Sequence, residues 1–468
     1  MSTNGPATTV RYGSWYDEME LRLAFPQGWT LHRLDPDDAD AISDGAVDAA
    51  FAHPIGSPRL SQLARAGRNA VVAIDDLSRP TPAHRVLPPL LRELAAGGIP
   101  AERVTLLFGM AAHRPMSRDE MEKKVGPAPL AACRVEQHDF LGEGLTDLGW
   151  IEGGPVRLAR TFVEADLRVC IGGVIPHNET GFGGGSKMIV PGLAGHETIA
   201  HFHGALPPRL AGVLGAAPGI VDRRAWSESV ARHVGPLATV ACVINSRREL
   251  AGLHVGDIVE AHRSAALEAT AIGRTVVPAQ LARECDVAVV NAYPLDTDPI
   301  QMGKSLNLTR KLGAKNSVVI NAASDGIFYH GMGMGMGIDR YRLLRNFRRW
   351  VFDPRAVRTF ARSLRAVRAP ALAARLGYFT LNPLSYAEFE QQMQPRQTDP
   401  VSNKGAEPLV FSRKFPAWGL RQKHPRGRLF DTWEDLALEL GRRHPTGRAL
   451  VFPCAPLQLP VLADDSPR

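Results

Sequence analysis

The sequence predicts an α/β protein of two domains, each built on a mostly parallel sheet with flanking helices. Apolar runs of strand length occur at residues 71–74, 104–108 and 167–171, and each is followed by glycine or polar residues. A helical pattern over residues 83–96 ends at Gly97 and separates the first two runs. Strands that alternate with helices in this way form parallel sheets, and ligands of such sheets gather at the C-terminal ends of the strands.

The chain has 468 residues, which is enough for two or more domains. We assign residues 1–275 to an N-terminal α/β domain and residues 276–468 to a C-terminal α/β domain, with the active site in the cleft between them. A short helix opens the second domain, at about residues 278–285. Its strands are expected at the apolar runs 286–290, 317–320 and 450–452.

The C-terminal domain is expected to carry a basic helical insertion over about residues 338–430. Eleven arginines lie between residues 340 and 375. Their spacing favours the solvated face of amphipathic helices over a surface for an anionic partner such as nucleic acid. Residues 385–428 are rich in proline, glutamine and lysine, which predicts long loops there.

Composition excludes several classes of protein. The chain is 44% hydrophobic and 22% charged, which is typical of a folded globular protein and argues against disorder throughout. Its longest apolar runs have the length of strands, so we expect neither a membrane span nor a secretory signal. The five cysteines include no C-x-x-C pair. This pattern argues against a disulfide framework or a thiolate metal site, and it fits a reducing cytoplasm.

Polar side chains follow two of the predicted strands. Asp76 and Arg79 place a carboxylate and a guanidinium on one tight loop after the first run, and His113 lies in the turn after the next. Because the C-terminal ends of parallel strands meet at one edge of a sheet, these residues are candidates for a shared site. Asp76 can also cap the following helix, a role compatible with contact to a ligand.

A glycine-rich turn is the most informative short motif of the chain. Gly183, Gly184 and Gly185 allow the backbone to approach a bulky or phosphorylated group closely. Lys187 follows directly, and a lysine there can meet a phosphate or form a covalent bond to a carbonyl-like cofactor. The turn is therefore a candidate site for a cofactor.

Two histidines flank this turn. His177 can carry protons near neutral pH, and His203 can offer a neutral nitrogen to a metal. In the second half, Gln301 and Lys304 are three residues apart and share one face of a helical turn. That face suits a substrate carboxylate, with Lys304 as a point charge and Gln301 as an amide donor. Neither a dinucleotide fingerprint after the first strand nor a P-loop is present.

Together these motifs resemble the lactate racemase family, enzymes that use a nickel-pincer nucleotide. The similarity covers roughly residues 10–337. It rests on a D-x-S/T-R-P loop, a G-x-x-x-H-R-P turn, P-H separated by nine residues from a lysine, and an H-x-H end, in that order. The combination is specific, although none of these motifs is specific alone.

The resemblance implies a cofactor, a pyridinium mononucleotide with two sulfur-containing arms that holds nickel. One arm would be joined to Lys187, and nickel would be held by two sulfurs, a ring carbon and His203. Asp76 and Arg79 match family residues near the cofactor and the substrate. The chain shows no sign of making this cofactor, so other proteins would supply it.

The resemblance also implies an activity, inversion of the C2 centre of a 2-hydroxy acid through a 2-keto acid. His113 and His177 match the two acid/base histidines on opposite faces of the substrate, and Gln301 and Lys304 match residues that orient its carboxylate. The C2 hydrogen is very weakly acidic, so its removal as a hydride by an electrophilic cofactor is more plausible than direct deprotonation by an imidazole.

Two other functions remain open at this point. The first is a net 2-hydroxy-acid oxidoreductase that uses the same cofactor and releases the keto acid. The second is a binding module that acts through the basic residues 340–375. The sequence does not identify the 2-hydroxy acid.

Overall fold

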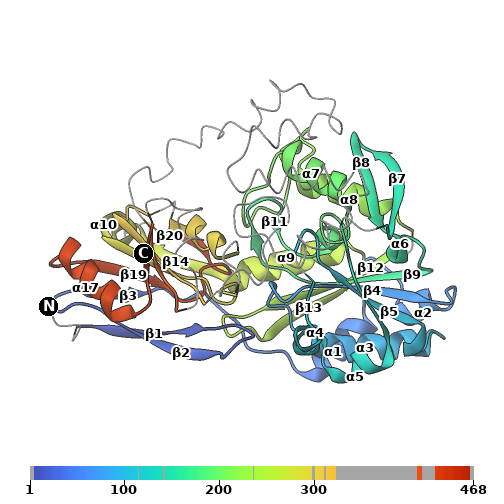
Figure 1. Cartoon of the computed structure of the whole chain (residues 1–468), viewed down its shortest axis with the longest axis horizontal. Helices are drawn as coiled ribbons and strands as arrows, with labels where there is room; N and C mark the ends of the chain where they lie inside the picture. The colour runs from blue at the N-terminus through green and yellow to red at the C-terminus, as the bar shows by residue number, and fades with distance from the viewer. Residues whose placement is uncertain are drawn as a thin grey trace, which may run out of the picture.

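The computed structural model describes residues 5–113, 115–140, 143–235, 237–297, 301–309, 312–322, 408–413 and 427–463 (Figure 1). Two six-stranded sheets lie side by side in it, one in each half of the molecule. The predicted α/β class with parallel sheets is therefore confirmed.

The first sheet has the strand order β13-β12-β9-β4-β5-β6, and all of its neighbouring strands are parallel except β12 and β13. All six residues of β4 are buried, because helices cover both faces of the sheet. The strands are β4 (Ala70–Asp75), β5 (Val104–Gly109), β6 (Arg134–Gln137), β9 (Leu167–Gly173), β12 (Leu237–Ile244) and β13 (Leu250–Gly256).

The helices of the first sheet form two layers (Figure 1). Val72 and Ile74 of β4 face one layer, whereas Val71 and Ala73 face the other, as the alternation of a strand requires. The first layer holds α1 (Asp44–Ala52), α2 (Leu60–Ala64), α3 (Ala83–Ala96), α4 (Arg118–Val125) and α5 (Pro127–Ala132). The second holds α6 (Arg160–Val163), α7 (His196–Gly204), α8 (Arg223–Arg232) and α9 (Glu260–Gly273).

Short elements surround the second layer. The hairpin β7–β8 (Leu145–Ile151 and Gly154–Ala159) leads into α6, and a small hairpin, β10–β11 (Pro176–His177 and Gly181–Phe182), follows β9. The 3-10 turn η2 (Gly185–Met188) comes directly after this hairpin. The glycine-rich motif therefore starts close to the C-terminal end of a central strand, as expected.

The second sheet is fully parallel, with the order β18-β17-β16-β15-β19-β3. Its strands are β3 (Thr30–Arg33), β15 (Val287–Asn291), β16 (Asn316–Ile320), β17 (Pro408–Phe411), β18 (Arg428–Phe430) and β19 (Arg448–Phe452). The hairpin β1–β2 (Ala7–Tyr12 and Met19–Ala24) and α17 (Trp433–Arg443) cover one face. The other face is covered by η3 (Gln301–Lys304), α10 (Ala279–Glu284) and α11 (Leu306–Thr309).

The start of the chain belongs to this second sheet. β3 pairs with β19, and Phe25 and Trp29 pack with Trp433 of α17 in one core. The predicted division at residue 275 does not anticipate this pairing, because it arises from packing between segments more than 400 residues apart. A second, parallel pair, β14 (Arg274–Pro278) with β20 (Leu459–Ala463), also links the two halves.

The loops predicted over residues 385–428 are wrong at one place, because β17 lies inside that stretch. Its four residues are too few to show a period, and their strand conformation is supported by β16 and β18 on either side. The rest of the predicted basic insertion falls outside the described residues, except residues 412–413 and 427–430.

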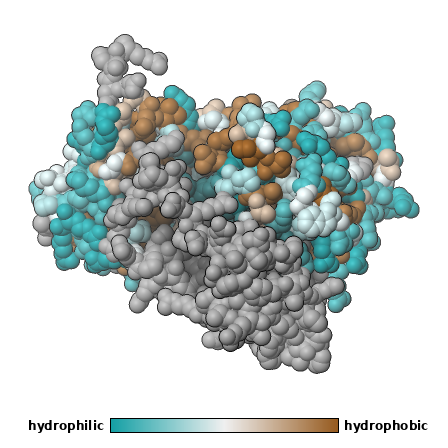
Figure 2. All heavy atoms as spheres, turned by 90° about the horizontal axis from the view of Figure 1, so that it is seen from above, coloured by the Kyte–Doolittle hydropathy of each residue, from teal (hydrophilic) through white to brown (hydrophobic). Residues whose placement is uncertain are grey.

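All five cysteines are free, and four of them are buried. Among the described residues, no helix combines the length and the apolar character that crossing a membrane requires. Between α7 and α8, four large apolar side chains are exposed: Leu210, Val213, Ile220 and Val221. Seen from above, the described surface carries apolar groups among hydrophilic ones (Figure 2).

Candidate functional site

The first two predicted motifs meet at the C-terminal edge of the first sheet. β4 and β5 are neighbours, with Asp75 opposite Gly109, so the segments that follow them start side by side. The Asp76 carboxylate accepts a hydrogen bond from Nδ1 of His113 and forms an ion pair with that ring when it is protonated. Both side chains are buried, at 3% and 4% exposure. This contact joins two residues that sequence analysis had selected separately.

Asp76 remains ionised although it is buried. Burial raises the pKa of its carboxyl, but His113, Arg79 and Ser78 together hold that pKa well below its usual range. The backbone N–H of Ser78 donates to Oδ1 at 2.9 Å, and the Ser78 hydroxyl donates to the same oxygen. An ionised Asp76 accepts a hydrogen bond from Nδ1–H of His113. A neutral His113 therefore has its ring lone pair on Nε2.

His177 and Lys187 form the second contact of the site. The Lys187 Nζ lies 2.7 Å from Nε2 of His177, and the backbone N–H of Glu179 donates to Nδ1 at 3.2 Å. Burial lowers the pKa of His177 well below its ordinary value, and Lys187, Lys304 and Arg79 lower it further. Burial and Arg79 lower the pKa of Lys187 in the same way, against the opposing effect of Glu179.

These shifts favour the neutral form of both side chains. A neutral imidazole that accepts at Nδ1 carries its proton on Nε2, from where it donates to the lone pair of the Lys187 amine. A neutral lysine amine is the nucleophilic form of that side chain. Lys187 is therefore suited to form a bond to an electrophilic carbon.

The glycines before Lys187 are needed for packing. Gly184 and Gly185 have φ values of +68° and +58°, a region that residues with a side chain rarely adopt. A Cβ on Gly183 would lie 2.9 Å from the carbonyl oxygen of Gly173, and a Cβ on Gly185 would lie 2.7 Å from the His262 ring. Packing and backbone conformation alone therefore require glycine at these positions. A role of these glycines in cofactor binding stays a prediction.

Arg224 and His262 bind the backbone of the glycine-rich loop, residues 180–184. The Arg224 guanidinium is fully buried and donates to the carbonyl of Gly184 at 3.0 Å, and also to the carbonyls of Thr180 and Phe182. Burial lowers the pKa of Arg224 to about 10. His262 lies 2.8 Å from the Gly183 carbonyl through Nε2. Burial also lowers the pKa of His262 well below its ordinary value, so this contact is made by a neutral ring.

His203 lies in the last turn of α7, half-buried. Its Nδ1–H donates to the carbonyl of Ile199 at 2.9 Å, and Nε2 lies 3.4 Å from Oε2 of Glu179. Glu179 also pairs with Arg223 at 2.9 Å. Burial raises the pKa of Glu179, but His203, Arg223 and Lys187 together lower it to about 2. A histidine whose Nδ1–H is held by a carbonyl offers Nε2 to a metal.

Among the described residues, no group of three or more histidine, cysteine, aspartate or glutamate side chains could hold a metal ion. A metal-binding role for His203 stays a prediction. The neighbouring His201 points elsewhere, because its ring packs against Trp226 with 5.0 Å between the ring centroids.

The second half of the chain reaches the same region through η3. Gln301 is buried there and Lys304 is half-buried. Lys304 is near enough to His177 to lower its pKa. Asn307, in α11, donates a side-chain hydrogen bond to Asn178, the residue next to His177. The segment that carries Gln301 and Lys304 is thus fixed to the hairpin that carries His177.

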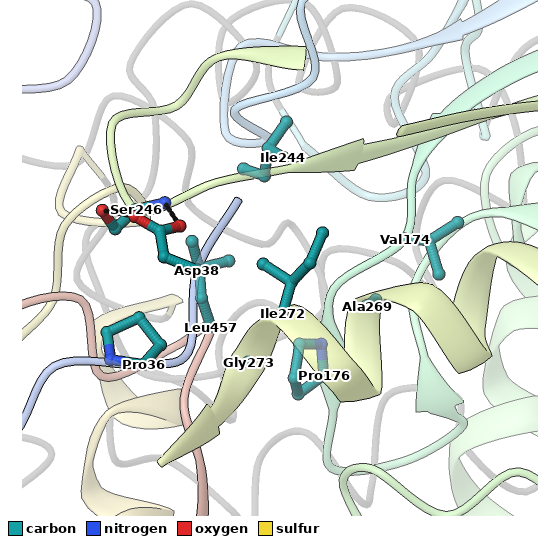
Figure 3. A pocket seen from close by; sticks show the side chains of 10 residues that line it. All are labelled: Pro36, Asp38, Val174, Pro176, Ile244, Ser246, Ala269, Ile272, Gly273 and Leu457. Carbon is teal, nitrogen blue, oxygen red and sulfur yellow. Dashed lines mark hydrogen bonds between the residues drawn. The ribbon is translucent and has the colours of Figure 1, made fainter. Parts of the chain in front are cut away.

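A small pocket lies behind this hairpin (Figure 3). Pro176 lines it from β10, Asp38 and Leu457 line it from the second half of the fold, and Ile272 lines it from α9. Asp38 accepts from the Ser246 hydroxyl at 2.6 Å at its rim (Figure 3). None of the predicted site residues lines this pocket, so it is separate from the candidate site.

Three charged residues that contact the loops of the site were not predicted from the sequence: Lys124, Glu179 and Arg224. Glu179 lies two residues after His177, and its charge within a motif rich in glycine was the available signal. Lys124 and Arg224 lie on helices distant in sequence, and only the fold brings them to the loops they hold.

Comparison with known proteins identifies relatives of this chain. Residues 16–210 match the family model described as the lactate racemase N-terminal domain. The chain is 27% identical to lactate racemase of Lactiplantibacillus plantarum over 303 residues, which cover 61% of this chain and 68% of that protein. It is 28% identical to lactate racemase of Thermoanaerobacterium thermosaccharolyticum over 295 residues, or 61% of this chain and 67% of that protein.

Two solved structures share the fold. The lactate racemase apoprotein of Thermoanaerobacterium thermosaccharolyticum superimposes with a TM-score of 0.66 at 21% identity, over 97% of this chain and all of that chain. A protein from Thermotoga maritima superimposes with a TM-score of 0.58 at 17% identity, over 91% of this chain and all of that chain. At these identities the structural similarity shows the fold.

Proposed function

The chain belongs to the lactate racemase family, and we propose that it is a racemase or epimerase that inverts the C2 centre of a 2-hydroxy acid. One observation carries the proposal. Two buried histidines, His113 and His177, follow the C-terminal ends of β5 and β9, and each has a fixed polar partner. Arg79 acts on both Asp76 and His177, which supports a shared site. Inversion needs an acid/base group for each face of the substrate, whereas a one-way oxidation needs one.

The cationic side chains of Lys304 and Arg79 are suited to bind the substrate carboxylate. Lys304 and Arg79 both act on His177, so they lie around the space that a substrate of His177 would occupy. Gln301 adds an amide on the same turn as Lys304. A carboxylate held by these groups would present its C2 centre and its hydroxyl to the histidines.

His113 is suited to take the hydroxyl proton. Its Nδ1–H is fixed by Asp76, so Nε2 is the accepting nitrogen, and the ionised Asp76 stabilises the imidazolium that forms. His177 serves the opposite face. It is neutral at pH 7 because burial and the neighbouring cations disfavour its charged form.

The residues present fit the nickel-pincer nucleotide that the family resemblance implies. Lys187 offers an amine whose neutral form is favoured by burial for the covalent link, and His203 offers Nε2 to nickel. When bound, this cofactor would supply an electrophilic acceptor for the C2 hydrogen as hydride. Proteins that synthesise the cofactor would supply it in trans, and the five free cysteines support a reducing compartment such as the cytoplasm.

The test is intact-protein mass and nickel content of protein made together with pincer-synthesis enzymes. Wild type should carry a nickel-containing adduct, and Lys187→Ala should carry none. Lys123→Ala is the matched control, because Lys123 is an exposed lysine remote from Lys187 in sequence and should leave the adduct unchanged. A wild-type protein without adduct and nickel under these conditions would exclude the pincer mechanism.

The loaded protein is then screened for inversion and for C2-hydrogen exchange across 2-hydroxy acids. Racemisation should proceed without an added electron acceptor and without accumulation of keto acid. Stoichiometric keto acid that depends on an added acceptor would instead identify a net oxidoreductase with the same site.

A further inference from the structure

Lys124 is a buried charged residue that the proposed reaction does not use. It lies in the last turn of α4, and its side chain is fully buried. Lysine is almost never buried unless it is paired. Burial lowers the pKa of Lys124, and the carboxylate of Asp75 opposes that shift at 2.5 Å from Nζ.

The ion pair and both hydrogen bonds of this ammonium lie in one short loop. Besides its ion pair with the Asp75 carboxylate, Nζ donates to the carbonyl of Arg79 at 2.9 Å and to the carbonyl of Asp76 at 3.2 Å. These polar contacts of Lys124 therefore all go to residues 75–79. This loop carries two predicted site residues, one at each of the carbonyls that Lys124 holds.

Asp75 extends the same network to the next strand. Its Oδ2 accepts from the Thr81 hydroxyl at 2.6 Å and from the backbone N–H of Gly173 at 3.2 Å. Gly173 is the last residue of β9, the strand that leads to the His177 hairpin. On its outer side, the Lys124 ammonium faces the ring of Trp15, with 5.4 Å to the ring centroid.

A buried ion pair is a weak source of stability, because the cost of removing two charges from water offsets much of their attraction. An apolar pair of similar volume would serve the core as well. What an apolar pair cannot do is donate to two backbone carbonyls and thereby fix the course of a loop.

We propose that Lys124 is a positioning residue that holds the loop 75–79 in the course that brings Asp76 to His113 and Arg79 to the site. Its importance for turnover rests on the proposed function, whereas its hold on the loop does not. The structural alternative is that Lys124 only neutralises Asp75.

Four variants separate these roles: Lys124→Met, Asp75→Asn, the double variant with both changes, and Lys123→Met. Lys124→Met leaves Asp75 buried without its cation, so it should lower the free energy of unfolding. The double variant removes both charges and should recover much of that loss, because the amide oxygen that Asp75→Asn introduces can still accept from Thr81 and Gly173. Lys123 is the exposed neighbour on α4 and serves as the matched control.

The first readout is hydrogen–deuterium exchange of the apo proteins, which needs neither cofactor nor substrate. In the double variant, the amides of Ser78 and Arg79 should exchange at least about tenfold faster than in wild type despite recovered stability. Both amides are bonded to Asp76 in the wild-type loop. If these two amides exchange in the double variant at the wild-type rate, the proposal is overturned, and Lys124 acts only as a counter-ion of Asp75.

The second readout is turnover per loaded site, with loading measured as adduct mass. The double variant should lose at least about tenfold in kcat, and Lys123→Met should lose nothing. Faster exchange with unchanged kcat and KM would overturn the positioning role in the reaction. If wild type itself shows neither adduct nor turnover, the proposed function fails, and the exchange experiment still decides whether Lys124 holds the loop.

Discussion

His113 and His177 are matched to the same kind of role in the proposed reaction, yet their surroundings are opposite. His113 is bonded to the ionised carboxylate of Asp76. His177 is bonded to the amine of Lys187, and it faces further cations that include Lys304 and Arg79. Both rings are buried, so water does little to equalise the two environments.

This difference makes the two histidines unequal partners. A carboxylate beside His113 stabilises the imidazolium that forms when it accepts a proton, as in other pairs of histidine and carboxylate. Cations around His177 favour its neutral ring instead. The two faces of the substrate would therefore meet groups with different proton affinities, although racemisation proceeds in both directions.

Replacing either histidine gives the largest expected effect. His113→Asn and His177→Asn should each lower racemisation by about 10²–10⁴-fold per loaded site, because inversion needs proton transfer at both faces. The measurement is turnover of each enantiomer, normalised to adduct mass. Replacement of His233, an exposed residue directly after the end of α8, by asparagine (His233→Asn) should leave turnover unchanged. A variant that keeps a tenth or more of the activity would remove its histidine from the acid/base pair.

Removing the carboxylate tests the His113 side alone. Asp76→Asn should lower kcat by about 10²-fold, since an amide neither fixes Nδ1–H as firmly nor stabilises the imidazolium. KM should change less, because Asp76 is buried behind the histidine. Asp48→Asn on the exposed side of α1 is the control. Equal losses in kcat for Asp76→Asn and the control would show that the pair has no part in turnover.

The contact between Asp76 and His113 could be anticipated from sequence because parallel strands bring their ends together. The helix over residues 83–96 was likewise predictable, since its apolar spacing and the following glycine are both local signals, and α3 has those bounds. Both features depend on information within a single β-α-β unit.

The supports of the site could not be anticipated in that way. Lys124 reaches the loop 75–79 across 45 or more residues of chain, and Arg224 reaches Gly184 across 40. Nothing in the local sequence of either helix distinguishes a buried cation from a solvated one. The place of β3 beside β19 has the same origin, because a four-residue strand is assigned to a sheet by packing rather than by its own pattern.

The pH dependence of the free energy of unfolding should distinguish the surroundings of His177 from those of His113 and Asp76. The pKa of folded His177 lies below the ordinary value of 6.5, so below that pH the unfolded chain binds a proton that the folded protein does not. Stability should therefore fall from pH 7 to pH 5, by at most about 2 kcal/mol for each such histidine. The pKa of folded Asp76 is lowered instead, so its contribution is present above the ordinary value of 3.8 and is lost only as the pH falls below it.

Denaturant unfolding of the apo protein at pH 7, 6 and 5 measures this dependence. His177→Asn should flatten the curve, and His262→Asn should flatten it in the same range, because burial lowers the pKa of His262 as well. Asp48→Asn, the exposed control on α1, should leave the slope between pH 7 and pH 5 unchanged. A slope that does not respond to His177→Asn would contradict the comparison.

The smallest expected effect concerns Lys187 in the apo protein. Burial and Arg79 lower its pKa in the folded state, so folding disfavours the proton that the unfolded lysine carries below pH 10.5, and this opposes folding. Lys187→Met removes that cost and should raise the free energy of unfolding at pH 7 by about 1 kcal/mol.

The difference in the free energy of unfolding should shrink as the pH rises toward 10.5, where the unfolded lysine also loses its proton. Because Lys187 also lowers the pKa of His177, the variant should weaken the loss of stability between pH 7 and pH 5. A less stable variant at pH 7, with an unchanged dependence on pH, would mean that Lys187 is held as a charged group, and its suitability as a nucleophile would no longer follow from the fold.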